Sequence, residues 1–133
     1  MTVETLHLSA TAIMVGVIWI VQLVHYPSFY FIEEKNFQEF SYFHQRNITY
    51  IVGPVMLIEF LSGLYLLPKS EILFQVNMVL LVFTWLVTFF FSVKEHNHLI
   101  SGKDLESIRR LVKSNWARTI LWTIRLIILG VII

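Results

Sequence analysis

Long apolar runs separated by short polar segments dominate the pattern of the chain and predict four membrane-spanning helices. The runs cover about residues 8–32, 48–67, 72–94 and 116–133. An α-helix crosses a hydrocarbon core of roughly 30 Å with about 20 residues, so each run is long enough for one crossing. The runs also lack the alternation that is typical of barrel strands. We therefore predict an all-α fold, a polytopic bundle of four transmembrane helices that forms a single domain over residues 1–133.

The composition supports a membrane protein and excludes several classes of function. Hydrophobic residues make up 56% of the sequence and charged residues 14%, whereas an ordinary soluble domain has about 25% charged residues. The formal net charge of +1 excludes nucleic acid as the main partner, because no basic excess is present to neutralise phosphates. The absence of cysteine excludes disulfides, thiol catalysis and thiolate metal sites. The lipid bilayer is the expected partner.

Basic residues gather at one end of the predicted bundle, which indicates the orientation of the chain. The end that holds both termini and the connection between the second and third helices has one basic residue, Lys69. The basic residues of the opposite end are Lys35, Arg46, Lys94, Lys103, Arg109, Arg110, Lys113 and Arg118. Positively charged loops stay in the cytoplasm, so we expect loops 33–47 and 95–115 to be cytoplasmic and both termini to lie outside. The predicted location is the cell membrane, which in a bacterium is the inner membrane.

Both basic loops carry patterns that indicate segments at the membrane surface. Phe37, Phe40 and Phe43 recur every three residues among charged residues, which predicts an interfacial helical turn before the second helix. Ser101 and Asp104 have the spacing of a capping box ahead of an apolar periodic stretch. We therefore predict a short interfacial helix between the third and fourth transmembrane helices. An interfacial aromatic belt is expected at Tyr26, Phe29, Tyr30, Tyr42, Tyr50 and Trp116.

Polar side chains inside the spans are the candidates for a functional site, because each is costly in lipid and is expected to face the bundle interior. They recur on every helix at spacings of three, four or seven residues, which keep them on one face. The Gly53-Pro54 pair must bend the second helix, which can leave room for a ligand. The candidate binding residues are Gln22, His25, Glu59, Thr84, Thr88, Arg118, Trp122 and Arg125. No catalytic residue is assigned.

Glu59 and Arg125 are two charged candidates at similar depth. Counted at about 1.5 Å per residue from the cytoplasmic ends of their spans, Glu59 lies roughly 16 Å deep and Arg125 roughly 15 Å deep. Equal depth on the second and fourth helices permits a direct ion pair. Two interpretations stay open: a clasp that fixes the packing of the helices, or groups that bind a substrate, a proton or the carboxylate of a cofactor.

The five histidines are candidate ligands of a transition metal or of haem b, because histidine is the commonest metal ligand and a frequent axial ligand of haem. The sequence contains neither an HxxxH nor an HExxH motif, so hydrogen bonds to lipid head groups and backbone are the alternative interpretation. His25 lies inside a span, where a functional or a packed polar role is expected. The candidate metal ligands are His7, His25, His44, His96 and His98.

Short motifs spread over most of the chain carry a resemblance to known families. They are Leu6-His7, Arg46-Asn47-Ile48, Gly53-Pro54, Gly63-Leu64, Leu99 to Gly102, Asn115 and Thr119. This pattern resembles the four-helix membrane families that include the HemJ-type protoporphyrinogen oxidases and the copper-resistance D proteins. The resemblance implies an oxidase that binds haem b through His7, but Asn77 stands where those proteins have a lysine in the third helix. The start of the last helix, Asn115-Trp116 and Arg118-Thr119, is also similar to that of anthrone-oxygenase-like membrane proteins.

Three functions are consistent with these features. The first is a haem- or metal-binding redox protein that acts on a hydrophobic small molecule, with His25 or His7 as a ligand and Arg125 holding an anionic group. The second is a non-enzymatic binding protein, or a subunit of a larger membrane complex, in which the buried polar residues are structural. The third is a small transporter or proton conduit along Glu59, His25 and His44. It would have to be a homo-oligomer, because one copy is too small for inverted repeats.

Overall fold

The computed structural model describes residues 2–133, apart from the side chain of Lys69, and this part of the chain forms four helical rods joined by short connections. The first rod consists of α1 (Val3–Ile20), η1 (Val21–His25), α2 (Tyr26–Ser28) and η2 (Phe29–Phe31). The second consists of α3 (Glu34–Leu66) and η3 (Leu67–Lys69). The third consists of α4 (Ile72–Val87), η4 (Thr88–Val93) and α5 (Lys94–Ile100), and the fourth is α6 (Leu105–Ile132). The predicted all-α fold with four helices is confirmed.

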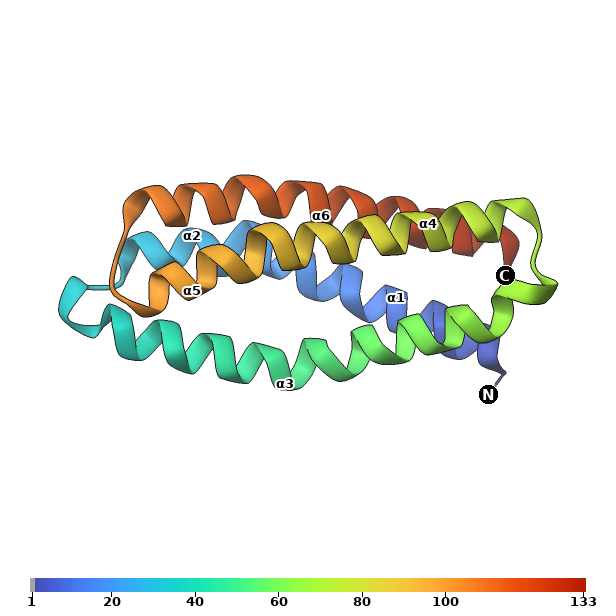
Figure 1. Cartoon of the computed structure of the whole chain (residues 1–133), viewed down its shortest axis with the longest axis horizontal. Helices are drawn as coiled ribbons and strands as arrows, with labels where there is room; N and C mark the ends of the chain where they lie inside the picture. The colour runs from blue at the N-terminus through green and yellow to red at the C-terminus, as the bar shows by residue number, and fades with distance from the viewer. Residues whose placement is uncertain (1) are drawn as a thin grey trace.

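The four rods lie lengthwise beside one another, with both termini at the same end of the bundle (Figure 1). We call this end, which also holds the connection between α3 and α4, the terminal end. The opposite end, with the connections that follow η2 and α5, is called the basic end. α6 packs against both α1 and α4, whereas α3 packs along α1 and meets α5 only at the basic end.

Each rod is long and apolar enough to cross a membrane, as the sequence predicted. The four helical stretches contain 28 to 33 residues, which corresponds to roughly 42–50 Å of helix against a hydrocarbon core of roughly 30 Å. At the basic end the helices continue beyond the predicted spans, because α3 already begins at Glu34 and α6 at Leu105. The bundle is therefore longer than the apolar runs alone indicate.

The stretch predicted as a separate interfacial helix is the beginning of α6. This helix runs without interruption from Leu105 to Ile132, because neither glycine nor proline occurs in it before Gly130. Its N-cap is Asp104 and not the predicted Ser101, since the Asp104 carboxylate accepts hydrogen bonds from the backbone N–H groups of Glu106 and Ser107. The hydrogen bond from the Ser107 hydroxyl is the main reason that the pKa of Asp104 lies below its usual range, and the bonds from these two N–H groups lower this pKa further.

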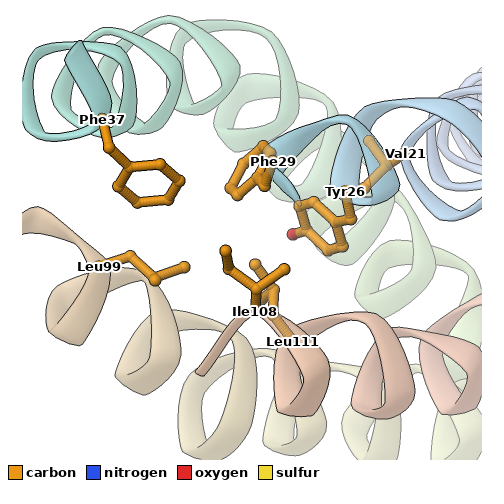
Figure 2. Close-up of a cluster of buried hydrophobic side chains, with 7 residues drawn as sticks. All are labelled: Val21, Tyr26, Phe29, Phe37, Leu99, Ile108 and Leu111. Atoms are coloured by element: carbon orange, nitrogen blue, oxygen red, sulfur yellow. The ribbon is translucent and has the colours of Figure 1, made fainter. Parts of the chain in front are cut away.

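An apolar core closes the basic end (Figure 2). It brings together side chains from all four rods, namely Val21, Tyr26, Phe29, Phe37, Leu99, Ile108 and Leu111. Phe37, predicted to lie in an interfacial turn, is part of the continuous helix α3 and is fully buried in this core. Lys103, in the connection between α5 and α6, ties this connection to the end of the first rod. Its ammonium group donates to the carbonyls of Tyr30 and Ile32 at 2.9 and 2.6 Å.

Candidate functional site

A buried ion pair between Glu59 of α3 and Arg125 of α6 forms the first polar cluster of the bundle. Neither side chain is exposed. Thr11 donates to Glu59 Oε1 at 2.7 Å, and the Trp122 indole donates to Glu59 Oε2 at 3.2 Å. Arg125 Nε donates to the backbone and side-chain oxygens of Asn77, both at 3.2 Å. This group of five residues, the ion-pair cluster, connects all four rods through charge-assisted hydrogen bonds.

Close packing surrounds the ion-pair cluster on the side of the terminal end. His7 is fully buried, its Nδ1 lies 2.9 Å from the Ser62 hydroxyl, and its ring packs against Phe74 with the centroids 5.4 Å apart. A Cβ atom added to Gly63 would overlap the Met78 side chain and lie 3.0 Å from His7 Cε1. His7 Nε2 has no hydrogen-bond partner within residues 2–133. None of the cavities described below is lined by His7, the residue for which the resemblance implied haem binding.

Arg118 is the centre of a second polar cluster, which lies nearer the basic end. Its side chain is buried, and Nη1 donates to the Ser92 hydroxyl and to Asn115 Oδ1, both at 3.1 Å. Asn115 is held in turn by Gln22, whose Oε1 accepts from the Asn115 amide at 2.9 Å. Gln22 also donates to the carbonyl of Val112 at 3.3 Å. This network fixes the guanidinium between α6, η1 and η4. We call Arg118 with these three neutral side chains the Arg118 cluster.

The charge of Arg118 is not compensated by a carboxylate of the described chain. No Asp or Glu among residues 2–133 lies within ion-pair distance of its guanidinium. Its Nε–H has no acceptor in the same part of the chain, although only 6% of the residue is exposed. The guanidinium lies over the ring of Trp122, 5.3 Å from its centroid. Arg118 thus differs from Arg125, whose charge Glu59 neutralises at contact distance.

A cavity of about 270 Å³ adjoins the Arg118 cluster. Its polar end is formed by Arg118, Ser92, Tyr26 and His96. The remaining lining is mostly apolar and comes from α1, η1, α3, α4 and η4, with the residues Met14, Val17, Ile18, Val21, Gln45, Ile48, Thr49, Val52, Gly53, Met56, Trp85, Thr88, Phe89 and Val93. Because Thr49, Gly53, Phe89 and Val93 are exposed on the outer surface, the cavity opens sideways between α3 and η4.

Two π-helical segments line this cavity, and such segments are frequent at functional sites. η1 precedes Pro27, which has no N–H group to continue the regular helix, and the N–H of Tyr26 bonds the carbonyl of Val21 five residues back. η4 begins at Thr88, whose hydroxyl donates to the Thr84 carbonyl at 2.8 Å, a bond that often distorts helices. The two segments contribute Val21, Thr88, Phe89, Ser92 and Val93 to the lining.

Three histidines of the basic half, His25, His44 and His96, come together beside the cavity. His25 Nε2 and His44 Nδ1 are 2.6 Å apart, and the rings of His44 and His96 have centroids 5.1 Å apart. The Tyr26 hydroxyl lies 3.0 Å from His96 Nε2. His25 and His44 also line a second cavity, of about 320 Å³, on the other side of the α1–α3 contact. Within residues 2–133, no three His, Asp or Glu side chains are arranged as a set that could hold a metal ion.

The structure divides the predicted candidate residues among separate places. Thr88 and Arg118 line the cavity of about 270 Å³, and Gln22 and Trp122 support Arg118. The remaining candidates lie elsewhere: Glu59 and Arg125 in the ion-pair cluster, His25 at the second cavity, and Thr84 bonded to the Leu80 carbonyl of its own helix. Among the candidate metal ligands, His7 lies near the start of α1, toward the terminal end, whereas the other four lie in the basic half. His98 is half exposed, and its Nδ1 lies 3.9 Å from Glu95 Oε2.

Sequence reasoning missed several residues that complete these sites. Ser92 lies four residues after Thr88 and eight after Thr84, so its place on the polar stripe was a usable signal. Asn77 lies on the same predicted polar stripe, seven residues before Thr84, but it is not among the candidate binding residues, although it holds Arg125. Tyr26 was assigned to an interfacial belt, but it is buried and lies at the polar end of the cavity. No pattern in the sequence distinguishes an aromatic residue at the interface from one covered by another helix.

The fold and these sites define a small membrane protein with four candidate transmembrane helices, a buried ion pair and a cavity that opens sideways. Comparisons with protein-family models, curated proteins and solved structures find no match to this chain.

Proposed function

We propose that the protein binds an amphiphilic small molecule, which it takes up from the bilayer between α3 and η4. The observation that carries the proposal is the cavity of about 270 Å³, with exposed apolar walls at its mouth and a buried polar end at Arg118. Ligand sites are typically apolar clefts of about 300–1,000 Å³ with a few convergent polar groups. This cavity accommodates a polar head group and the adjoining part of a chain, whose remainder stays in lipid.

The separation of the two polar clusters supports a binding role for only one of them. Glu59 and Arg125 are fully buried, line neither of the cavities described above and neutralise each other, so we assign the ion-pair cluster a structural role. Each cluster contains one buried guanidinium N–H group without an acceptor among residues 2–133, on Arg125 Nη2 and on Arg118 Nε. Only Arg118 also lines a cavity and lacks a carboxylate that balances its charge. Unpaired buried donors are costly, and a ligand bound in the cavity would satisfy that of Arg118.

Narrowing the mouth of the cavity is expected to weaken binding. In the variant Val93→Trp, the indole occupies part of the opening, and we expect the affinity for radiolabelled dodecanol to fall roughly tenfold or more because the alkyl chain meets a steric clash. Saturable binding to the purified protein in a neutral maltoside detergent, followed by scintillation proximity, measures the effect.

The matched control is Val79→Trp, because Val79 is equally a surface valine of the third rod but lies at neither cavity described above. The control variant is expected to bind dodecanol like the wild-type protein. The same affinity in both variants would show that the cavity is not a binding site.

We also propose that the basic end faces the cytoplasm of a cell membrane and that both termini face outside. Eight of the ten Lys and Arg residues belong to the basic end and its loops, and positively charged loops are retained in the cytoplasm. With roughly 42–50 Å of helix in a core of roughly 30 Å, the apolar core around Phe37 then lies in the interfacial region. The first turns of α6 lie at the same level, in keeping with the interfacial location predicted for them.

A redox function at the histidine cluster is a second candidate, favoured by the contact between His25 and His44 and by the nearness of His96. Imidazole is the commonest side-chain ligand of transition metals and a frequent axial ligand of haem, and two imidazoles are in contact here. This candidate predicts a Soret band, or iron or copper in stoichiometric amount, in the protein purified in mild detergent. A colourless, metal-free sample that gains no absorbance when haem or copper is added would eliminate it.

A further inference from the structure

We infer that the ligand of the cavity carries a single negative charge, on a carboxylate head group that pairs with Arg118. The inference rests on the proposed function, since it names the chemical class of the molecule that the cavity binds. It is carried by the buried position of Arg118 and by the absence of a counter-charge in residues 2–133.

A buried guanidinium without a counter-charge is costly, because it has lost its hydration and gains only neutral hydrogen bonds in return. Ser92 and Asn115 accept from Nη1, but both are neutral. The bundle pairs its other buried charges, since Glu59 neutralises Arg125 and Glu95 binds Arg110 through two hydrogen bonds. Arg118 is the exception in the described chain, so its counter-charge must come from another molecule.

The geometry of the polar end favours a carboxylate as that counter-charge. Arg118 lines the cavity and has a buried Nε–H without an acceptor among residues 2–133, and a guanidinium binds a carboxylate through two parallel hydrogen bonds along one edge. One arginine balances one negative charge. His96, of which 8% is exposed, offers a second unpaired nitrogen, Nδ1, at the same end. A carboxylate head group at this end would therefore lie close to one cation, Arg118, and to one additional polar group, His96 Nδ1.

The rest of the cavity favours an apolar body. Between the polar end and the mouth the lining consists largely of side chains such as Met14, Ile18, Val52, Met56 and Phe89. A simple alkyl chain gains dispersion contacts with these residues and leaves no polar group unpaired. A long-chain carboxylate from the bilayer matches both ends of the cavity.

Three probes that share one chain and differ in charge test the inference on the wild-type protein. Radiolabelled dodecanoate is displaced by unlabelled dodecanoate, dodecanol or dodecylammonium in neutral maltoside detergent, with bound label followed by scintillation proximity. Pairing with a buried charge predicts that dodecanoate binds about thirtyfold more tightly than dodecanol, or more, and that dodecylammonium binds weakest. Equal affinity of the acid and the alcohol would overturn the inference and leave the proposed binding function intact. If none of the probes binds saturably, the proposed function itself fails.

Charge variants assign the preference to Arg118. The variant Arg118→Gln is expected to bind dodecanoate and dodecanol equally, whereas Arg118→Lys keeps the charge and retains part of the preference for the acid. The control Lys113→Gln removes an exposed charge of the same helix that does not line this cavity, and it should preserve the full preference. A preference for the acid that persists in Arg118→Gln would refute the assignment. So would its loss in Lys113→Gln, because the selectivity would then arise at the surface.

Discussion

Replacing Glu59 by glutamine is expected to lower the free energy of unfolding by about 3–5 kcal/mol, because it leaves the buried Arg125 charge without its partner. Glutamine has nearly the shape of glutamate, but Thr11 and Trp122 donate to different oxygens of the carboxylate, so the amide keeps only one of these two acceptors. The loss therefore reports the charge together with one hydrogen bond, and not the packing. Unfolding of the purified protein in mixed detergent micelles, followed by circular dichroism, measures the change.

Glu39→Gln is the matched control, since Glu39 is an exposed residue of the same helix for which the structure shows no ion pair. Its stability should equal that of the wild type. In the double variant Glu59→Gln/Arg125→Gln no unpaired charge remains, and part of the lost stability should return. If Glu59→Gln unfolds like the control, the ion pair does not stabilise the bundle.

Replacing Gly63 by leucine is expected to destabilise the bundle by about 1–3 kcal/mol, because the site has no room for a larger side chain. The first added atom, Cβ, would already lie 2.7 Å from Met78 Cε and 3.0 Å from His7 Cε1. The flexible end of Met78 can move away from one carbon atom, but a full leucine must also displace the His7 ring from Ser62. The same unfolding experiment measures the loss.

Gly16→Leu provides the comparison for this substitution. Gly16 lies in α1, is exposed, and a Cβ added to it meets no atom within 4 Å. Leucine there should leave the stability unchanged or raise it slightly, because glycine is the poorer helix former. Equal effects at the two glycines would show that α1, α3 and α4 are not closely packed at Gly63.

The fold could be predicted because a helix that crosses lipid needs about 20 consecutive apolar residues, and the four long apolar runs meet this requirement. The ends of the helices at the basic end could not be predicted in the same way. Hydropathy identifies the part of a helix that is compatible with lipid, whereas residues such as Glu34, Lys35 and Arg109 are good helix formers that prolong it in water. The predicted boundary between the third connection and the last helix therefore lay within α6.

The charged residues of the candidate site could be predicted from the sequence, but the shape of the cavity could not. Arg118, Glu59 and Arg125 are conspicuous because each interrupts an apolar run. The cavity depends on η1 and η4, where the chain leaves the regular 3.6-residue period that any assignment of residues to helix faces assumes. It also depends on the separation of α3 from α4, whose backbones do not pack closely against each other. For these reasons the place of Tyr26 at the cavity could not be predicted, whereas the spacing from Thr84 and Thr88 already marks Ser92 as a polar stripe residue.

Trp122 touches both polar clusters, since its indole N–H donates to Glu59 and the guanidinium of Arg118 lies over its ring. The two clusters consequently share a rigid side chain on one face of α6. Any ligand that shifts Arg118 also changes the environment of the indole and, through it, the free energy of the ion pair. By thermodynamic reciprocity, the strength of the ion pair then sets part of the affinity of the cavity. If the cavity binds the proposed ligand, the rigidity of the bundle and the occupancy of the cavity are therefore coupled through Trp122.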